Sequence, residues 1–476
     1  MTERDVYSNP LIARYAGREM AALWGDQRRF STWRRLWVAL AETEKDLGLA
    51  ITAGQIAALK SKIDDVDFDA ADDYEKRFRH DVMAHIHAFG DAAPEARGVI
   101  HLGATSCFVT DNADLILMRD GLDLLLGRLA EVVANLADFA RNFRSTPTLG
   151  FTHFQPAQLT TVGKRACLWL ADLCMDEDEI RRRRDELKLR GAKGTTGTQA
   201  SFLALFDGDH AKVRRLDARI AETFGFPGVY PVTGQTYSRK VDSQIVDVLS
   251  GLAQSAHKLA TDLRLLAHRR EVEEPFETEQ IGSSAMPYKR NPMRSERICG
   301  IARYLMALPA AMADTTATQW FERTLDDSAC RRLTIPQAFL AADAVLKLLA
   351  NVTKGLVVHE KVIAKGVEAE LPFMATENVM MAAVRAGGDR QELHERIRVH
   401  SHAAGDRIKR EGEANDLLDR LRRDGAFTKV DWTAVLNPAD YIGRAPEQVD
   451  EFLADVVKPL LSRYADRKPG DSSIDV

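Results

Sequence analysis

The eleven residues from Gly282 to Pro292 (G-S-S-A-M-P-Y-K-R-N-P) place hydroxyl, cationic and amide side chains on one short segment. Its glycine and prolines predict a loop that acts as a hinged lid over a ligand. Lys289 and Asn291 could stabilise the negative charge that develops on an enolate-like carboxylate. Ser283 or Ser284 is then the candidate base, if a positive field and exclusion of water favour the alkoxide. The alternative is a solvated surface loop.

His153 is a second candidate for proton transfer. It follows Thr152 and lies between Gly150 and Pro156, which predicts irregular backbone just before a helix. A histidine held in this way can donate a proton to a leaving nitrogen near neutral pH. Otherwise it is a helix cap or a solvent contact.

A group of histidines near residue 80 raises the question of a metal site. His80 and His87 are seven residues apart and would share a helix face, but His85 points well away from them and no H-E-x-x-H motif occurs. We therefore expect no metal here, and we expect His85 and His87 to be structural.

Several segments together resemble one enzyme family. The string G-S-S-x-M-P-x-K-x-N resembles the signature of the fumarase/aspartase superfamily, whose members eliminate fumarate from a succinyl group. Residues 286–297 are similar to the animal-type branch of the adenylosuccinate lyase family. Four further segments fit the same family: R-H-D-V (79–82), H-L-G-A-T-S (101–106), T-H-F-Q-P-A-Q (152–158) and Q-W-F-E-R-T-L-D-D-S (319–328). The resemblance covers most of the chain and is weakest in its last hundred residues.

The resemblance implies roles for the catalytic residues. Ser283, the first serine after the glycine, matches the family base, and Lys289 and Asn291 match the residues that hold the aci-carboxylate intermediate. His153 matches the general acid, and Glu296 matches the carboxylate that fixes its tautomer. The implied reaction is that of a C–N lyase of purine nucleotide biosynthesis. It releases fumarate from adenylosuccinate, giving AMP, and from succinyl-aminoimidazole-carboxamide ribotide, giving AICAR, without any cofactor.

Such a substrate carries a phosphate and two carboxylates, and it requires several arginines and other polar side chains. The resemblance assigns substrate contacts to Arg14, Tyr15, Arg79, His80, Asp81, Thr105, Ser106, Thr152, Gln155, Gln235, Arg297, Arg323, Ser328 and Arg332. Asp81 is expected to help orient His80. Phe108 and Cys330 replace a tyrosine and an asparagine of the family pattern, so we expect hydrogen bonding around the site to differ there.

Composition is compatible with such an enzyme. The chain has 476 residues, 45% of them hydrophobic, which is enough for two or three domains with a large core. A net charge of -5 argues against a nucleic-acid binder that relies on a general basic surface. Five cysteines without C-x-x-C spacing indicate reduced thiols in a cytosol. The charged first ten residues, and the lack of an uninterrupted apolar run of roughly 18 residues, predict a soluble cytoplasmic protein without a membrane partner.

Long helices are expected to position these residues. Apolar residues recur at steps of three and four, with Asp111 and Asn112 as cap candidates for the first helix. The pattern covers residues 115–139 and 241–266, and more noisily about 158–190, 294–318 and 335–352. Helices of about 30 residues are about 45 Å long, which favours a bundle shared between subunits over a monomeric bundle or a coiled coil.

We therefore expect an all-α protein with the three-domain fumarase/aspartase-like fold and a central long-helix bundle shared in a homotetramer. The expected domains are residues 1–105, 106–358 and 359–476, the first and last of them helical and the second forming the bundle. No G-x-G-x-x-G follows a strand, so a Rossmann site is not expected. The glycine-rich residues 191–198 either offer backbone amides to an anion or form a turn. Because the motifs lie on distant segments, each active site is expected to draw on more than one subunit.

Two alternatives remain open. A related lyase acting on argininosuccinate or another fumarate adduct would share the lid, but would not need the phosphate-facing Arg14, Arg79 and His80. A structural relative would keep the fold without catalysis. The presence of all four catalytic side chains of the lid and of the segment 152–158 argues against it.

Overall fold

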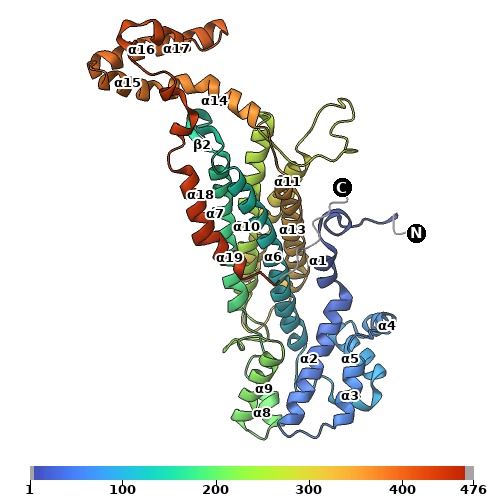
Figure 1. Ribbon diagram of the computed structural model, residues 1–476. Helices are drawn as coiled ribbons and strands as arrows, with labels where there is room; N and C mark the ends of the chain where they lie inside the picture. Colours follow the sequence, from blue (N-terminus) through green and yellow to red (C-terminus); the bar gives the residue numbers. More distant parts are fainter. Residues whose placement is uncertain (1–4, 467–476) are drawn as a thin grey trace.

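Figure 1 shows the computed structural model, which describes residues 5–466, as an elongated molecule built mainly from helices. The prediction of an all-α protein is confirmed. Long helices run side by side along the molecule and form its central bundle. They are α6 (Cys107–Asn142), α7 (Val162–Glu186), α10 (Lys240–His268), α11 (Met293–Ala307) and α13 (Asp326–Lys354).

Further helices surround the bundle, and those at its lower end in Figure 1 come from two parts of the chain. The N-terminal ones there are α2 (Asp26–Asp46), α3 (Ala53–Ser61), α4 (Phe68–Phe78) and α5 (Asp81–Ala92), with a 3-10 helix at Pro94–Val99. The π-helical turn at Leu11–Tyr15 and α1 (Arg18–Leu23) precede them and lie beside the middle of the bundle. The others at the lower end are α8 (Ala200–Leu205) and α9 (His210–Thr223), and α12 (Pro309–Ala317) lies between α11 and α13.

Strands are few and short. β1 (Pro147–Thr152) pairs antiparallel with β2 (Gln155–Thr161), and this hairpin stands at the upper end of the bundle in Figure 1. β3 (Val272–Glu273) pairs antiparallel with β4 (Val357–Val358).

The C-terminal segment forms a lobe at the upper end and then returns to the bundle. Its helices are α14 (Glu360–Met374), α15 (Thr376–Arg385), α16 (Arg390–Asp406), α17 (Leu417–Arg423), α18 (Ala445–Phe452) and α19 (Lys458–Ser462), with short π or 3-10 helices at Arg407–Glu411, Gly425–Phe427, Ala434–Leu436, Pro438–Tyr441 and Leu453–Val457. Residues of α15–α17 build a core of their own around Phe427, whereas Val449 and Leu460 of the returning helices pack into the bundle core. The division of the chain at residues 105 and 358 stays a prediction.

The apolar stripe predicted for α6 forms the centre of the main core. Leu115, Leu122 and Leu129 are fully buried, as are the stripe positions between them. Leu136 continues the same face near the end of the helix. This periodicity of three and four residues places one face of α6 against its neighbours over most of its length.

The predicted start of α6 is wrong. The helix begins at Cys107, so Asp111 and Asn112 lie inside it and are buried instead of capping it. The Asn112 amide donates to the carbonyl oxygens of Phe108 and Gly191 over 2.8 and 3.2 Å, and its oxygen accepts from the Gly191 amide at 3.0 Å. Capping residues and residues that bind a distant segment have the same polar side chains, which explains the error.

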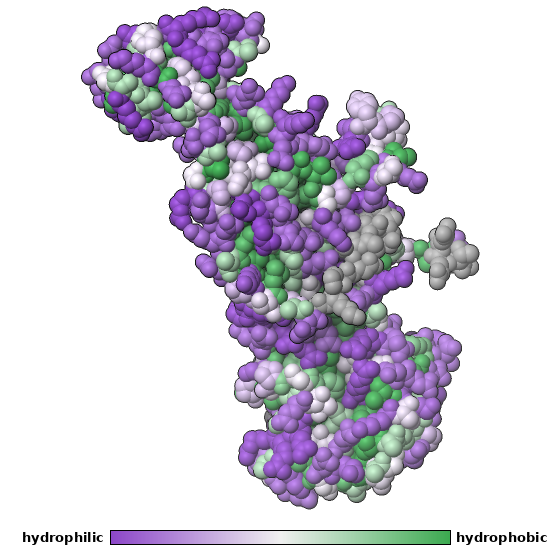
Figure 2. Space-filling view, viewed as in Figure 1, coloured by the Kyte–Doolittle hydropathy of each residue, from purple (hydrophilic) through white to green (hydrophobic). Residues whose placement is uncertain are grey.

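By length and composition, α13 is apolar enough to cross a membrane, but 78% of its most apolar window is buried inside the protein. It is therefore a core helix of the bundle. Figure 2 shows a mostly hydrophilic lobe at the upper end and apolar patches along the flank of the bundle.

Candidate active site

Polar residues from four distant segments meet at the lower end of the bundle. The Ser106 hydroxyl lies 3.4 Å from Nε2 of His80, and Arg332 donates to Asp81 over 2.6 Å. The Cys107 thiol points to Gln235 Oε1 at 3.7 Å. The starts of α5, α6, α10 and α13 thus bring together five of the residues that sequence analysis assigned to substrate binding, and we name them the binding cluster: His80, Asp81, Ser106, Gln235 and Arg332.

The orientation of His80 differs from the prediction. His80 is the N-cap of α5, and its Nδ1 accepts a hydrogen bond from the Met83 amide at 3.3 Å. Asp81 lies 3.8 Å from that nitrogen and pairs with Arg332 instead. The Met83 amide has a fixed position in the first turn of α5, whereas the Asp81 carboxylate can rotate. The hydrogen bond from this amide therefore directs Nε2 of His80 toward Ser106.

The two neighbouring histidines have structural roles. His85 stacks on Phe30 at a centroid distance of 3.7 Å, and burial lowers the pKa of His85 to about 4, so it is neutral at pH 7. His87 stacks on Tyr74 and contacts Arg97. Within residues 5–466, no three His, Cys, Asp or Glu side chains are grouped as metal ligands.

Four further predicted contact residues lie on the same segments as the binding cluster. Thr105 is half-buried beside Ser106, and Ser328 is half-buried at the start of α13. Arg323 is also half-buried, and its Nη1 lies 4.0 Å from Asp327 Oδ2. Arg79 is exposed at the end of α4, where its backbone has a φ of 56°.

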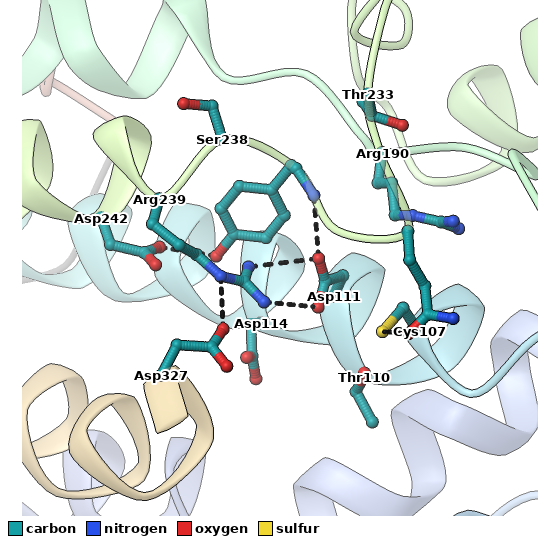
Figure 3. A network of polar contacts seen from close by, with 12 residues as sticks. Cys107, Thr110, Asp111, Asp114, Arg190, Thr233, Ser238, Arg239, Asp242 and Asp327 are labelled. Atoms are coloured by element: carbon teal, nitrogen blue, oxygen red, sulfur yellow. Dashed lines mark hydrogen bonds and ion pairs between the residues drawn. The ribbon is translucent and has the colours of Figure 1, made fainter. Parts of the chain in front are cut away.

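A buried ionic network supports the binding cluster (Figure 3). Arg239 forks onto Asp111 with hydrogen bonds of 3.1 and 3.2 Å, and its Nε donates to Asp327 over 2.7 Å. Burial disfavours the charged form of Arg239, but the attraction of Asp111 outweighs it and raises the pKa of Arg239. We name Asp111, Arg239 and Asp327 the buried triad. Sequence analysis missed it.

A second buried arginine extends this network. Arg331 donates to Asp242 at 2.7 Å and to Asp114 at 2.9 Å. It also donates to the Tyr237 hydroxyl, which in turn donates to Asp242, both over 2.6 Å. The Tyr237 amide donates to Asp111 over 3.0 Å, so both arginines tie the start of α10 to α6 and α13.

His153 lies at the tip of the β1–β2 hairpin. His153 and Phe154 have positive φ angles of 51° and 59°, and both are exposed. Thr152 and Gln155 flank them and are exposed too. The predicted irregular backbone is therefore the turn of a hairpin, and the next helix begins only at Val162.

The residues of the lid form an open loop between β3 and α11 (Figure 1). Asn291 donates to the Gly282 carbonyl oxygen over 2.7 Å, which closes the base of the loop. The Ser283 hydroxyl accepts from the Met286 amide at 3.2 Å, and Lys289 is exposed. A Cβ at Gly282 would collide with the Lys289 carbonyl oxygen, so this crossing of the two loop strands requires glycine.

The remaining predicted residues lie near the lid. Glu296 is exposed in the first turn of α11, and the guanidinium of Arg297 lies 5.8 Å from the centre of the Tyr15 ring. Arg14 is exposed in the turn at Leu11–Tyr15. Among residues 5–466 no ion pair joins His153 to Glu296, so their predicted pairing does not occur within this single chain.

One chain does not bring all these groups together. The binding cluster lies at the start of α6, and the His153 hairpin follows the end of this 36-residue helix. At 1.5 Å per residue the two are about 54 Å apart along its axis. The lid likewise lies beyond the far end of the 29-residue α10, about 44 Å from the start of that helix.

The glycine-rich residues 191–198 form a packed turn. The amides of Gly191 and Ala192 donate to Asn112 and Asp217, and buried Arg190 donates to the Gly191 and Gly194 carbonyl oxygens. A Cβ at Gly197 would collide with the Thr233 carbonyl oxygen. The turn therefore supports the segment that carries Gln235.

Phe108 and Cys330, the two residues that differ from the family pattern, place no polar group in the binding cluster. Phe108 is buried in the bundle core. The thiol of Cys330 lies 3.3 Å from the Thr315 hydroxyl and 3.7 Å from that of Thr334, facing α12.

Comparison with known proteins identifies clear relatives. The family model described as "Lyase" matches residues 34–307, and "Adenylosuccinate lyase C-terminus" matches residues 372–452. The chain is 53% identical to the adenylosuccinate lyase of Saccharomyces cerevisiae and 54% identical to that of Schizosaccharomyces pombe, in both cases over 98% of this chain and 97% of the relative. It is 50% identical to the adenylosuccinate lyase of Schistosoma mansoni over the full length of both chains.

Solved structures support the fold. The 3-carboxy-cis,cis-muconate lactonizing enzyme of Pseudomonas putida matches with a TM-score of 0.81 at 22% identity, over 96% of this chain and all of the other. A fumarate lyase of Mesorhizobium sp. BNC1 matches with a TM-score of 0.77 at 24% identity, over 94% of this chain and all of the other.

Proposed function

The chain belongs to the adenylosuccinate lyase family, and from this premise we propose that it cleaves adenylosuccinate to AMP and fumarate. We extend the proposal to succinyl-aminoimidazole-carboxamide ribotide, which carries the same succinyl group and would give AICAR. The observation that carries the proposal is the identity of 50 to 54% with three adenylosuccinate lyases over nearly the whole chain.

The proposed mechanism moves one proton from carbon to nitrogen. Ser283, as the alkoxide, removes the proton from the succinyl Cβ, and the electron pair passes into the adjacent carboxylate. Lys289 and Asn291 stabilise the resulting aci-carboxylate, because a fixed cation and an amide donor are already in place when the charge appears. The C–N bond then breaks as the double bond of fumarate forms, and His153, oriented by Glu296, protonates the departing amine.

The proposed binding groups match the charges of the substrate. Arg79 and His80 are assigned to the phosphate or the reacting end, and Arg14 is also assigned to the phosphate. The other contacts are assigned to Tyr15, Asp81, Thr105, Ser106, Thr152, Gln155, Gln235, Arg297, Arg323, Ser328 and Arg332. Most of these side chains are exposed or half-buried, so they are open to a ligand or to another subunit.

We propose that each active site is assembled from several subunits of a homotetramer. The distance of about 54 Å between the binding cluster and the His153 hairpin supports this, since no loop movement spans the length of α6. Large apolar side chains on the outside of the bundle helices also favour burial against other chains. They include Leu168 and Met175 of α7, Leu265 of α10, Tyr304 of α11 and Leu333 of α13, which are 39 to 62% exposed.

We also propose a cytoplasmic location and catalysis without a metal. Five unpaired cysteines, four of them buried, support a reducing compartment. The proposed chemistry needs only the side chains named above, so a chelator should leave turnover unchanged. Loss of turnover with the chelator would contradict this part of the proposal.

The test measures fumarate release by absorbance from adenylosuccinate and from argininosuccinate. We expect turnover of the first and not of the second. Ser283→Ala should lower kcat by roughly 10²-fold or more, as expected for the loss of a general base. Ser284→Ala, in the neighbouring and more exposed position, is the matched control and should retain most activity. Turnover of argininosuccinate alone, or equal loss in both variants, would refute the assignment.

A further inference from the structure

Arg239 is buried, yet it connects three of the four segments that carry the binding cluster. Its side chain is 2% exposed and contacts Asp111 of α6 and Asp327 of α13. Asp111 follows Ser106 by five residues, and Arg239 itself follows Gln235 by four residues. A change at Arg239 therefore acts on the groups that bind substrate without any contact to the substrate.

Two arginines compete for one carboxylate in this network. Oδ2 of Asp327 lies 2.7 Å from Nε of Arg239 and 4.0 Å from Nη1 of Arg323. The side chain of Asp327 is fully buried, whereas that of Arg323 is 26% exposed. The closer arginine neutralises the carboxylate, and a neutralised carboxylate attracts a second cation only weakly.

Removal of the Arg239 charge would change this balance. Within the described part of the chain, Asp327 forms ion pairs with these two arginines only, so Arg323 would be its remaining cation. A buried carboxylate without a partner is strongly disfavoured, and Arg323 needs to move little more than 1 Å to form a direct hydrogen bond. It would then point into the protein and away from a bound anion.

We propose that Arg239 is a positioning residue that neutralises Asp327 and thereby keeps Arg323 available to an anionic group of the substrate. The inference rests on the proposed function, in which Arg323 contacts substrate. Arg239 has no direct part in proton transfer. Its effect is therefore expected in KM and not in kcat, since Arg323 would bind the ground state and the transition state alike.

The test is steady-state kinetics of purified tetramers of the wild type, R239Q and the double variant R239Q/D327N. The loss of one charge-assisted hydrogen bond to the substrate should raise the KM of R239Q for adenylosuccinate by roughly tenfold or more. The kcat per folded site should stay within about threefold of the wild type. The double variant lacks the carboxylate that captures Arg323, so its KM should return most of the way to the wild-type value.

A purely structural role predicts a different result. Folded R239Q would then lose kcat at unchanged KM, and the added D327N change would not restore it. Either outcome overturns the proposal. R463Q is the matched control, because it also removes an arginine from a buried carboxylate, that of Glu177. Arg463 directly follows α19 in the returning C-terminal segment. R463Q should lower the melting temperature without raising KM.

The single variant D327N keeps the test valid if R239Q does not fold. Arg239 then retains its fork to Asp111, while Arg323 loses the competing charge. We expect the KM of D327N to be no higher than that of the wild type. A tenfold higher KM, which corresponds to about 1.4 kcal/mol of binding free energy, would overturn the proposal. An inactive wild type would instead refute the proposed function, so the two failures are distinguishable.

Discussion

Mixing two inactive variants tests whether one active site takes residues from different subunits. The variants are Ser283→Ala, in the lid, and His153→Ala, in the β1–β2 hairpin, which stands apart from the lid at the upper end of the bundle in Figure 1. If a site takes the two residues from different chains, each is intact with a probability of about one half after random exchange of equal amounts. Both are then intact in about a quarter of the sites, and the mixture should regain about a quarter of wild-type activity.

The assay is fumarate release after the two variants have been dissociated, mixed and reassembled. Subunit exchange is verified independently by mass spectrometry of tagged chains. The matched control mixes Ser283→Ala with Lys289→Ala. These residues lie on one loop, so every loop in the mixture carries one of the two changes, and no activity should return in any arrangement.

Two results would refute the reasoning about shared sites. The first is no recovery in the His153→Ala mixture despite complete exchange, which would mean that Ser283 and His153 of one chain act together. The second is recovery in the Ser283→Ala and Lys289→Ala mixture, which would mean that the lid is not used as one unit.

Two further predictions concern stability. Glu44 of α2 is fully buried without a hydrogen-bond partner for either carboxylate oxygen, and burial raises its pKa to about 8. The folded state keeps a proton that the unfolded state loses above pH 4.5, so stability is greatest below that pH and falls as pH rises toward 8, by at most about 1.4 kcal/mol per pH unit. Glu44→Gln should remove this pH dependence. The melting temperature of the variant, relative to that of the wild type, should therefore rise from pH 5 to pH 8. A difference in melting temperature that stays constant over this range would contradict the prediction. Gly197→Ala places a Cβ against the Thr233 carbonyl oxygen at a φ of +84° and should cost about 2 kcal/mol or more in urea unfolding, whereas Gly425→Ala, which meets nothing within 4 Å, should change stability little.

The long helices could be predicted from periodicity, but their ends could not. The stripe over 115–139 identified α6, while its start depended on whether polar side chains cap the helix or bind another segment. The run over 294–318 reads as one helix and is in fact two, because Pro309 begins α12. The β1–β2 hairpin was missed, since its tip requires positive φ angles at two residues that are not glycine.

The chemistry of the site could be predicted further than its geometry. Motif residues such as Ser106 and His80 were recognised by their resemblance to a family, and the structure brings them together. The partners of the buried triad are 88 and 128 positions apart in sequence, and nothing in one sequence indicates that they meet. Asp327 lies inside a recognised motif, but Asp111 and Arg239 lie outside the motifs, where charged residues are most often found on the surface.

Helix length connects these observations to function. Because α6 and α10 hold the binding cluster at one end and the hairpin and the lid at the other, the proposed homotetramer closes the lid of one chain over substrate bound to another. A ligand bound across subunits of the proposed tetramer would stabilise that assembly by mass action, since it would bind the tetramer and not the separated chain. Activity per chain should therefore fall on dilution to the concentration at which the tetramer dissociates, and saturating AMP should shift that concentration downward. If the specific activity stayed constant while the tetramer was measured to dissociate, a single chain would complete its own site. That result would contradict the argument from the length of α6.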